Sequence, residues 1–217
     1  MKSTNGKKWK LIGLLIVLLM AFVLSGCLKD NKQEKIMSIE VLGPLKAVLI
    51  IARQGFQDFE YNETKRVLEE AGVEVSTASL DKGLAVGKLG QKVEVEMSLN
   101  EINLEDFDAV IFIGGPGAAD YEDDPLAHKL AQQTMEQGRV LGAICIAPTI
   151  LAKAGILEGR KATVWSDPIV QETIEILREQ GADYVDEAVV VDGKLITANG
   201  PGAAAEFGQK IVETLNK

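Results

Sequence analysis

Residues 142–151 read GAICIAPTIL, where an apolar run meets the start of a helix. The run begins at Val140 and stays apolar to Ile144, as expected of a strand buried on both faces of a parallel sheet. Pro148 is favoured in the first turn of a helix. The segment therefore predicts a strand, a tight turn at Cys145 and then a helix.

The same alternation runs through the chain on either side of this segment. Near-continuous apolar runs predict strands at 47–52, 73–78 and 107–113, and an amphipathic pattern over 60–71, stopped by Gly72, predicts a helix. Strands that alternate with helices favour a mostly parallel sheet covered by helices on both faces. We therefore expect a three-layer α/β domain over residues 46–217.

Three further segments depart from this alternation. Residues 84–97 mix apolar and polar positions with several glycines, which predicts a small hairpin or an edge excursion. The pair Asp192-Gly193 lies between 189–191 and 195–197 and predicts an antiparallel hairpin. The last helix is expected from about Ala203 to Leu215.

The amino-acid composition and net charge exclude some classes of protein. The 217 residues are 47% hydrophobic and 25% charged, which is typical of a globular protein. The formal net charge of -9 argues against a nucleic-acid partner, because such binding depends on clustered Lys and Arg.

The first 26 residues have the layout of a secretory signal peptide. Several lysines precede an uncharged run over 11–24, which is followed by Ser25 and Gly26. A helix of about 14 residues would span roughly 21 Å, less than a bilayer core of about 30 Å. A transmembrane helix is therefore the weaker interpretation.

The sequence Leu24-Ser25-Gly26-Cys27 resembles the bacterial lipobox, in which cleavage before the cysteine is coupled to its lipidation. We expect a lipid on Cys27, a linker over 27–45, and a domain anchored to the outer face of the cell membrane. The alternative is a plain signal anchor with an incidental cysteine.

With Cys27 lipidated, Cys145 is the one thiol left, so the domain makes no internal disulfide. A thiol at the start of a helix lies near unpaired amides and the positive end of the helix dipole, which predicts a lowered pKa and a nucleophilic thiolate. The alternative is a small buried hydrophobic residue.

Two loops that follow predicted strands are expected at the same edge of the sheet. Residues 114–120 read GGPGAAD, which is either a tight turn or a set of amides for an oxyanion. Residues 53–60 read RQGFQDFE and place Glu60 in a first helical turn. Glu60 either caps the helix or faces the sulfur as a buried carboxyl of raised pKa.

Taken together, the Phe-Glu pair, Gly-Gly-Pro-Gly, Ala-Ile-Cys-x-x-Pro and the Gly-Pro-Gly before the last helix resemble the PfpI superfamily over residues 46–217. That superfamily includes PfpI peptidases and the parkinsonism-associated protein deglycase, and is similar in fold to class I glutamine amidotransferases. The resemblance implies a flavodoxin-like sandwich, a nucleophile elbow and a homodimer. It also implies Cys145 as nucleophile, Glu60 as the adjacent acid, and the Gly115 and Ile146 amides as the oxyanion site.

The chain departs from the peptidase-like members at Ile146, where they carry histidine. The single histidine, His128, is expected on a surface helix as an ordinary solvated residue. Without an imidazole base, peptide hydrolysis lacks a donor for its poor leaving group. Reaction of the thiol with a small electrophile requires fewer catalytic groups than peptide hydrolysis does.

The leading hypothesis is a cysteine-dependent enzyme that acts on a small reactive carbonyl or its protein adduct. The alternatives are an oxidative-stress sensor or chaperone-like module, a ligand-binding domain with an unused cysteine, and, disfavoured, a cysteine peptidase. No metal site is expected from one histidine and one available thiol, and no cofactor motif is present.

Overall fold

The computed structural model describes residues 43–169 and 171–217, of which Pro44–Lys217 form one compact unit. The predicted signal peptide and the predicted lipid site at Cys27 lie outside the described residues. No helix within the described ranges is both long and apolar enough to span a bilayer.

In the described part of the chain, the main sheet has seven strands, in the order β11-β12-β8-β7-β1-β3-β6. All neighbouring pairs are parallel except β11 with β12, which form the predicted antiparallel hairpin around Asp192-Gly193. The bounds in sheet order are Val189–Asp192, Leu195–Ala198, Val140–Ile144, Ala109–Phe112, Lys46–Ile50, Glu74–Ser79 and Met97–Ser98.

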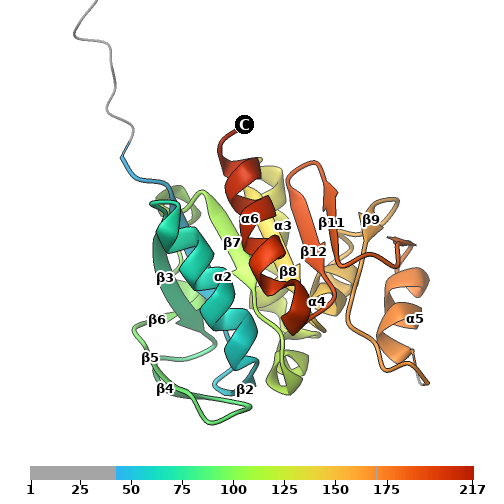
Figure 1. The fold of residues 1–217 in the computed structure, drawn as a ribbon, viewed down its shortest axis with the longest axis horizontal. Coiled ribbons are helices and arrows are strands. Elements are labelled where there is room, and N and C mark those ends of the chain that lie inside the picture. Colours follow the sequence, from blue (N-terminus) through green and yellow to red (C-terminus); the bar gives the residue numbers. More distant parts are fainter. Residues whose placement is uncertain (1–42, 170) are drawn as a thin grey trace, which may run out of the picture. The chain divides into compact units, whose positions relative to one another are not determined.

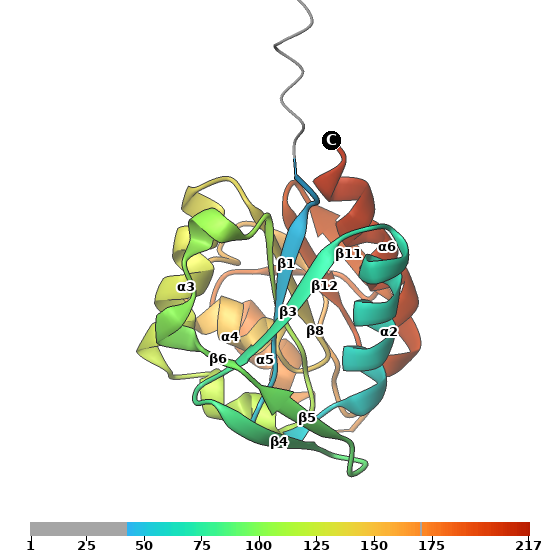
Figure 2. The same ribbon diagram turned by 90° about the vertical axis from the view of Figure 1, so that its left-hand side faces the viewer.

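Helices cover both faces of this sheet (Figures 1 and 2). Helices α2 (Asp58–Glu70) and α6 (Ala204–Leu215) pack against each other on one face, and α3 (Pro125–Glu136) and α4 (Pro148–Lys153) cover the other. The predicted flavodoxin-like three-layer sandwich with a mostly parallel sheet is therefore confirmed.

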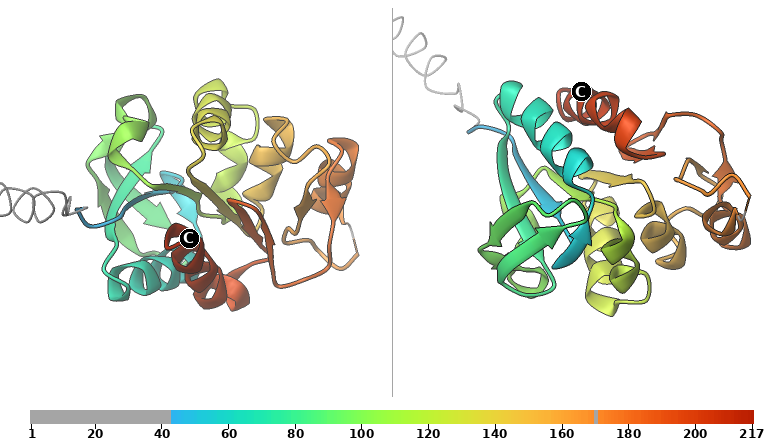
Figure 3. Two further views of the ribbon diagram at one scale, coloured as in Figure 1. Left: turned by 90° about the horizontal axis from the view of Figure 1, so that it is seen from above. Right: turned by 60° about the horizontal axis from the view of Figure 1, so that its bottom comes forward.

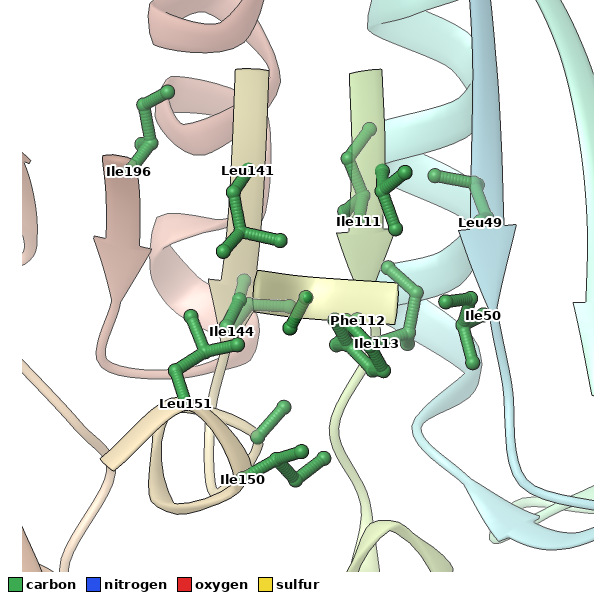
Figure 4. Close-up of a cluster of buried hydrophobic side chains, with 14 of the residues drawn as sticks. Leu49, Ile50, Ile111, Phe112, Ile113, Leu141, Ile144, Ile150, Leu151 and Ile196 are labelled. Carbon is green, nitrogen blue, oxygen red and sulfur yellow. The ribbon is translucent and has the colours of Figure 1, made fainter. Parts of the chain in front are cut away.

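The core explains why these strands lack polar alternation. Side chains from β1, β7, β8 and β12 gather with Ile150 and Leu151 of α4 in one cluster (Figure 4). Every residue of β8 is buried, which is the signature of a central strand. The cluster holds α4 against the sheet immediately after the turn at Cys145.

Most of the region over 84–97 is the predicted small hairpin and lies outside the main sheet. Strands β4 (Gly83–Gly87) and β5 (Lys92–Val95) form an antiparallel hairpin, and β4 also pairs in parallel with β2 (Gln54–Phe56). This small sheet is separate from the main one and lies at the opposite end of the domain from α5 (Glu172–Glu179), as Figures 1 and 3 show. The short strand β10 (Asp183–Tyr184) contacts α5 and pairs in parallel with β9 (Lys161–Ala162).

Short 3₁₀ segments complete the described chain, at Leu99–Glu101, Leu104–Asp106, Pro116–Tyr121 and Pro201–Ala203. Helix α2 begins at Asp58, two residues before the predicted start at Glu60. The reason is a local cap, because the Gln57 side chain accepts a hydrogen bond from the Phe59 amide at 3.3 Å.

Candidate active site at Cys145

Cys145 occupies the turn between β8 and α4 with a backbone φ of 65°, a left-handed value that is uncommon outside glycine. Two backbone hydrogen bonds fix it: the Cys145 amide donates to the Ala198 carbonyl at 2.9 Å, and its carbonyl accepts from the Trp165 amide at 2.8 Å. The predicted turn is thus a strained elbow held on both sides. Cys145 as a whole is 8% exposed.

Glu60 reaches the same point from the first turn of α2, where it is fully buried. The Gly114 amide donates to Glu60 Oε2 at 3.1 Å. Its other oxygen, Oε1, is buried and receives no hydrogen bond of ordinary geometry from the described residues. The Glu60 carboxyl also interacts with the Cys145 side chain. The structure therefore brings together the acid and the thiol predicted from sequence.

Gly114 allows this approach. A Cβ atom at this position would lie 2.4 Å from Cys145 Cβ and 2.8 Å from Glu60 Oε2, so only glycine fits between them. The next residue, Gly115, presents its amide to the Cys145 sulfur, and so does Ile146. Both predicted oxyanion amides thus lie at the sulfur.

The pKa of Cys145 corrects a prediction. Burial, followed by the neighbouring Glu60 carboxylate, raises the pKa of Cys145 from its ordinary 9.0 to about 12, although the Gly115 and Ile146 amides act in the lowering direction. The helix terminus was expected to dominate. The effect of the helix terminus on the pKa is smaller than the effect of burial, because the sulfur is largely buried. Helix α4 is also short, spanning only Pro148–Lys153, so its dipole is small.

The pKa of Glu60 is raised to about 7, chiefly by burial, while the Cys145 side chain, the Gly114 amide and the Lys88 charge lower it. Two buried acids in contact titrate as a pair. The pair therefore loses its first proton near pH 7, and because the pKa of Cys145 is raised to about 12, the remaining proton lies mainly on the sulfur. The ionised Glu60 carboxylate then lies beside the thiol as the base that can accept its proton.

A cavity of about 240 Å³ opens onto Cys145. Its lining, over the described chain, comprises Gln57, Lys88, Gly115, Pro116, Cys145, Ile146, Trp165 and Pro201. Three larger cavities lie elsewhere among the described residues, and none of the three is lined by Cys145 or Glu60. The chemistry available at the sulfur makes this small cavity the candidate active site.

The sequence did not identify Lys88, Gln57 or Trp165 as cavity residues. Gln57 precedes α2, and Lys88 comes from the β4–β5 hairpin, whose pairing with β2 depends on contacts far apart in sequence. Trp165 follows the mostly apolar residues 162–164, and a large aromatic residue in a loop after such a run is the local signal that the sequence offers for it.

His128 lies in α3, as expected, and away from this cavity. Its Nε2 atom is 2.7 Å from the Glu122 carbonyl oxygen. The ring is therefore engaged by backbone and does not supply a base at Cys145.

Comparison with known proteins places this geometry in context. Residues 46–214 match the DJ-1/PfpI family. A protein of Methanocaldococcus jannaschii is 36% identical over 94% of this chain and 96% of its own length. A deglycase of Thermococcus kodakarensis is 32% identical over 77% of this chain and 98% of its own length.

A glutathione-independent glyoxalase of Caenorhabditis elegans is 30% identical over 78% of this chain and 88% of its own length. Among solved structures, a ThiJ/PfpI domain protein of Brachyspira murdochii superposes with a TM-score of 0.75 at 33% identity, over 80% of this chain and 98% of that one.

Proposed function

Because the chain belongs to the DJ-1/PfpI family, we propose that it is a cysteine-dependent enzyme of small reactive carbonyls or their adducts, similar to its glyoxalase and deglycase relatives. One observation carries the proposal. The Cys145 sulfur meets the Glu60 carboxyl and the amides of Gly115 and Ile146 at the mouth of one cavity.

The proposed reaction begins when Glu60 takes the Cys145 proton and the sulfur adds to an aldehyde carbon, so that a carbon–sulfur bond replaces the carbonyl π bond. The two amides stabilise the resulting oxyanion until Glu60 donates that proton to it. With a 2-oxoaldehyde, Glu60 then moves a proton from the former aldehyde carbon to the neighbouring carbon through an enediol, while the hydroxyl proton passes to the neighbouring oxygen, which gives a 2-hydroxyacyl thioester. Water cleaves the thioester and restores the thiol, so the net change is addition of water.

The proposal is tested by turnover of methylglyoxal to lactate. Cys145→Ala, with its fold checked by circular dichroism, is expected to lose all turnover above background. Glu60→Gln is expected to lose about 10²–10⁴-fold, the usual contribution of a general acid–base group. Turnover retained by Cys145→Ala would rule out the proposal.

The redox alternative rests on the same contacts, since an oxidised sulfur carries oxygens that the two amides can bind. The redox alternative differs from the enzyme in the number of reactions per Cys145. A sensor takes up peroxide oxygen once per Cys145 and turns over no carbonyl. A binding domain, in contrast, keeps its ligand affinity in Cys145→Ala.

Peptidase activity remains the disfavoured alternative. The described residues that line the cavity include no histidine, and Ile146 occupies the position where the peptidase-like members carry one. A peptide leaving group would depend on Glu60 alone for its proton.

The cellular setting is part of the proposal. We place the domain at the outer face of the membrane, held by a lipid on Cys27, on the strength of the lysine-rich start, the apolar run and the lipobox-like Leu24–Cys27. Its partner is a small-molecule or protein-adduct substrate. A homodimer, which the family resemblance implies, is tested by sedimentation equilibrium of the detergent-solubilised chain.

A further inference from the structure

Lys88 is the one permanently charged residue among the described residues that line the Cys145 cavity. The rest of the lining is apolar or uncharged, with Pro116, Ile146, Trp165 and Pro201 as walls. Lys88 itself is solvent-exposed, so its charge acts on a ligand from the rim of the cavity and is weakened by salt. A ligand in this cavity therefore meets one fixed positive charge.

The Lys88 ammonium has no acidic partner in the described part of the chain, whereas Lys82 at the start of the same hairpin pairs with Glu101 at 2.6 Å. Its charge nevertheless reaches the reacting groups, because it lowers the pKa of Glu60. An unpaired cation beside a nucleophile is available to a ligand.

The loop that carries Lys88 is held in place by backbone hydrogen bonds. The Lys88 amide donates to the Phe56 carbonyl at 2.7 Å, and Gly87 donates to the Gln91 carbonyl at 2.7 Å. The buried carboxylate of Asp58 accepts from the Leu89 amide at 2.8 Å and from the Gln91 amide at 2.9 Å. Asp58 lies two residues before Glu60 in α2, so one helix turn positions both the acid and the lysine loop.

We propose that Lys88 selects electrophiles that carry an anionic group, such as a carboxylate beside the reacting carbonyl, over neutral ones of the same size. The inference rests on the proposed function, because it assigns the substrate class of the same cavity. The sulfur and its two amides receive the carbonyl, while Lys88 receives the permanent negative charge. The cavity, at about 240 Å³, is smaller than typical ligand sites of roughly 300–1,000 Å³, which favours a short oxo acid.

The test compares two alkylating reagents that differ in charge. Iodoacetate and iodoacetamide both form an Sγ–carbon bond with loss of iodide, so the ratio of their rate constants cancels any change in the thiolate population. The full chain is reacted with each reagent separately, and the Cys145 peptide is followed by mass spectrometry. Lys88→Met is the test variant, Lys88→Arg keeps the charge, and Lys92→Met removes an exposed lysine from the same small sheet.

We expect Lys88→Met to lower the iodoacetate-to-iodoacetamide ratio about tenfold, while Lys88→Arg and Lys92→Met stay within about twofold of the wild type. Raising the salt concentration lowers the wild-type ratio toward that of Lys88→Met. An equal ratio in the wild type and Lys88→Met overturns the inference and leaves the proposed function standing.

If Cys145 reacts with neither reagent, that result contradicts the proposed function but does not test the role of Lys88. A second measurement then tests the inference. Trp165 lines the same cavity, and in a Trp9→Phe full chain it is the one tryptophan. Iodide, an anionic quencher, should then quench Trp165 fluorescence about threefold less in Lys88→Met, while neutral acrylamide quenches both alike. Equal iodide quenching overturns the inference.

Discussion

Cys145 and Glu60 place two ionisable groups in contact where water is largely excluded. Each would be costly to ionise there alone, and burial is the leading cause of the raised pKa of both. The pair reduces the cost by retaining one proton above pH 7. In the proposed mechanism the Glu60 carboxylate takes the place of an imidazole base, which is consistent with the position of His128 away from the cavity.

The raised pKa of Glu60 has a consequence for stability. An unfolded Glu60 loses its proton near the ordinary value of 4.5, whereas the folded one keeps it up to about 7. Between these values the native state holds the extra proton, so the wild type loses stability as the pH rises. The loss over the full window is about 3 kcal/mol, at 1.36 kcal/mol per pKa unit.

Glu60→Gln carries no charge at any pH and should escape this loss. We expect its free energy of unfolding, relative to the wild type, to increase by about 3 kcal/mol between pH 4.5 and pH 8. Urea titrations at the two pH values measure it. Glu94→Gln, at an exposed position in β5, is the matched control and should follow the wild type. Parallel curves for Glu60→Gln and the wild type would show that Glu60 titrates normally.

At the scale of secondary structure, the β4–β5 hairpin connects the small sheet to the active site. Gly87 lies where the hairpin passes over α2, and a Cβ atom there would fall 2.4 Å from Asp58 Oδ1. The Asp58 side chain is tied to the loop by its two hydrogen bonds, so it has little freedom to move away.

Gly87→Ala should therefore destabilise the domain by about 1–3 kcal/mol, the usual cost of overpacking a filled site. Gly202→Ala, where the added Cβ meets nothing within 4 Å, is the control and should change stability by less than about 0.5 kcal/mol. Chemical denaturation measures both. A stability of Gly87→Ala equal to that of the control would mean that the loop and Asp58 are not rigidly packed.

Much of the fold was predictable because its signals are local. The buried strand over 140–144 was predicted to the residue, and the Asp192-Gly193 hairpin was confirmed. The β4–β5 hairpin was one of the two predictions for 84–97. Its pairing with β2 was not predicted, since the paired residues Gln54 and Val86 lie 32 positions apart. The candidate site divides in the same way. Cys145 and Glu60 could be predicted from local motifs and the turn, whereas Lys88 reaches the cavity only through the long-range pairing of β2 with β4.

The direction of the Cys145 pKa shift was wrong for a related reason. Helix position is visible in a sequence, whereas the depth of a side chain is a property of the packed molecule. Here burial outweighs the helix terminus.

At the scale of the whole chain, the domain and the N-terminal segment make separate predictions. The proposed chemistry belongs to the domain, and the proposed membrane anchor belongs to residues 1–27. The chain offers its own matched pair of variants, because it contains one cysteine in each part.

When the full chain is expressed in a bacterial host, we expect the wild type and Cys145→Ala to partition into the detergent phase of a Triton X-114 extraction. Both should begin at an acylated Cys27 by mass spectrometry. Cys27→Ser should lack the acyl mass and partition differently. An identical N-terminus and partition for Cys27→Ser would exclude lipidation and favour a plain signal anchor.

The most direct test of the Glu60–Cys145 pair is the pH dependence of Cys145 alkylation by iodoacetamide in the full chain, read on the Cys145 peptide. The same peptide in the urea-unfolded chain serves as the reference. We predict that the wild-type rate rises through a midpoint near pH 7, where Glu60 ionises and can accept the thiol proton as the sulfur attacks, and then levels off. In Glu60→Gln that step should be absent. A single rise near the ordinary thiol value of 9.0, unchanged in Glu60→Gln, would contradict the account.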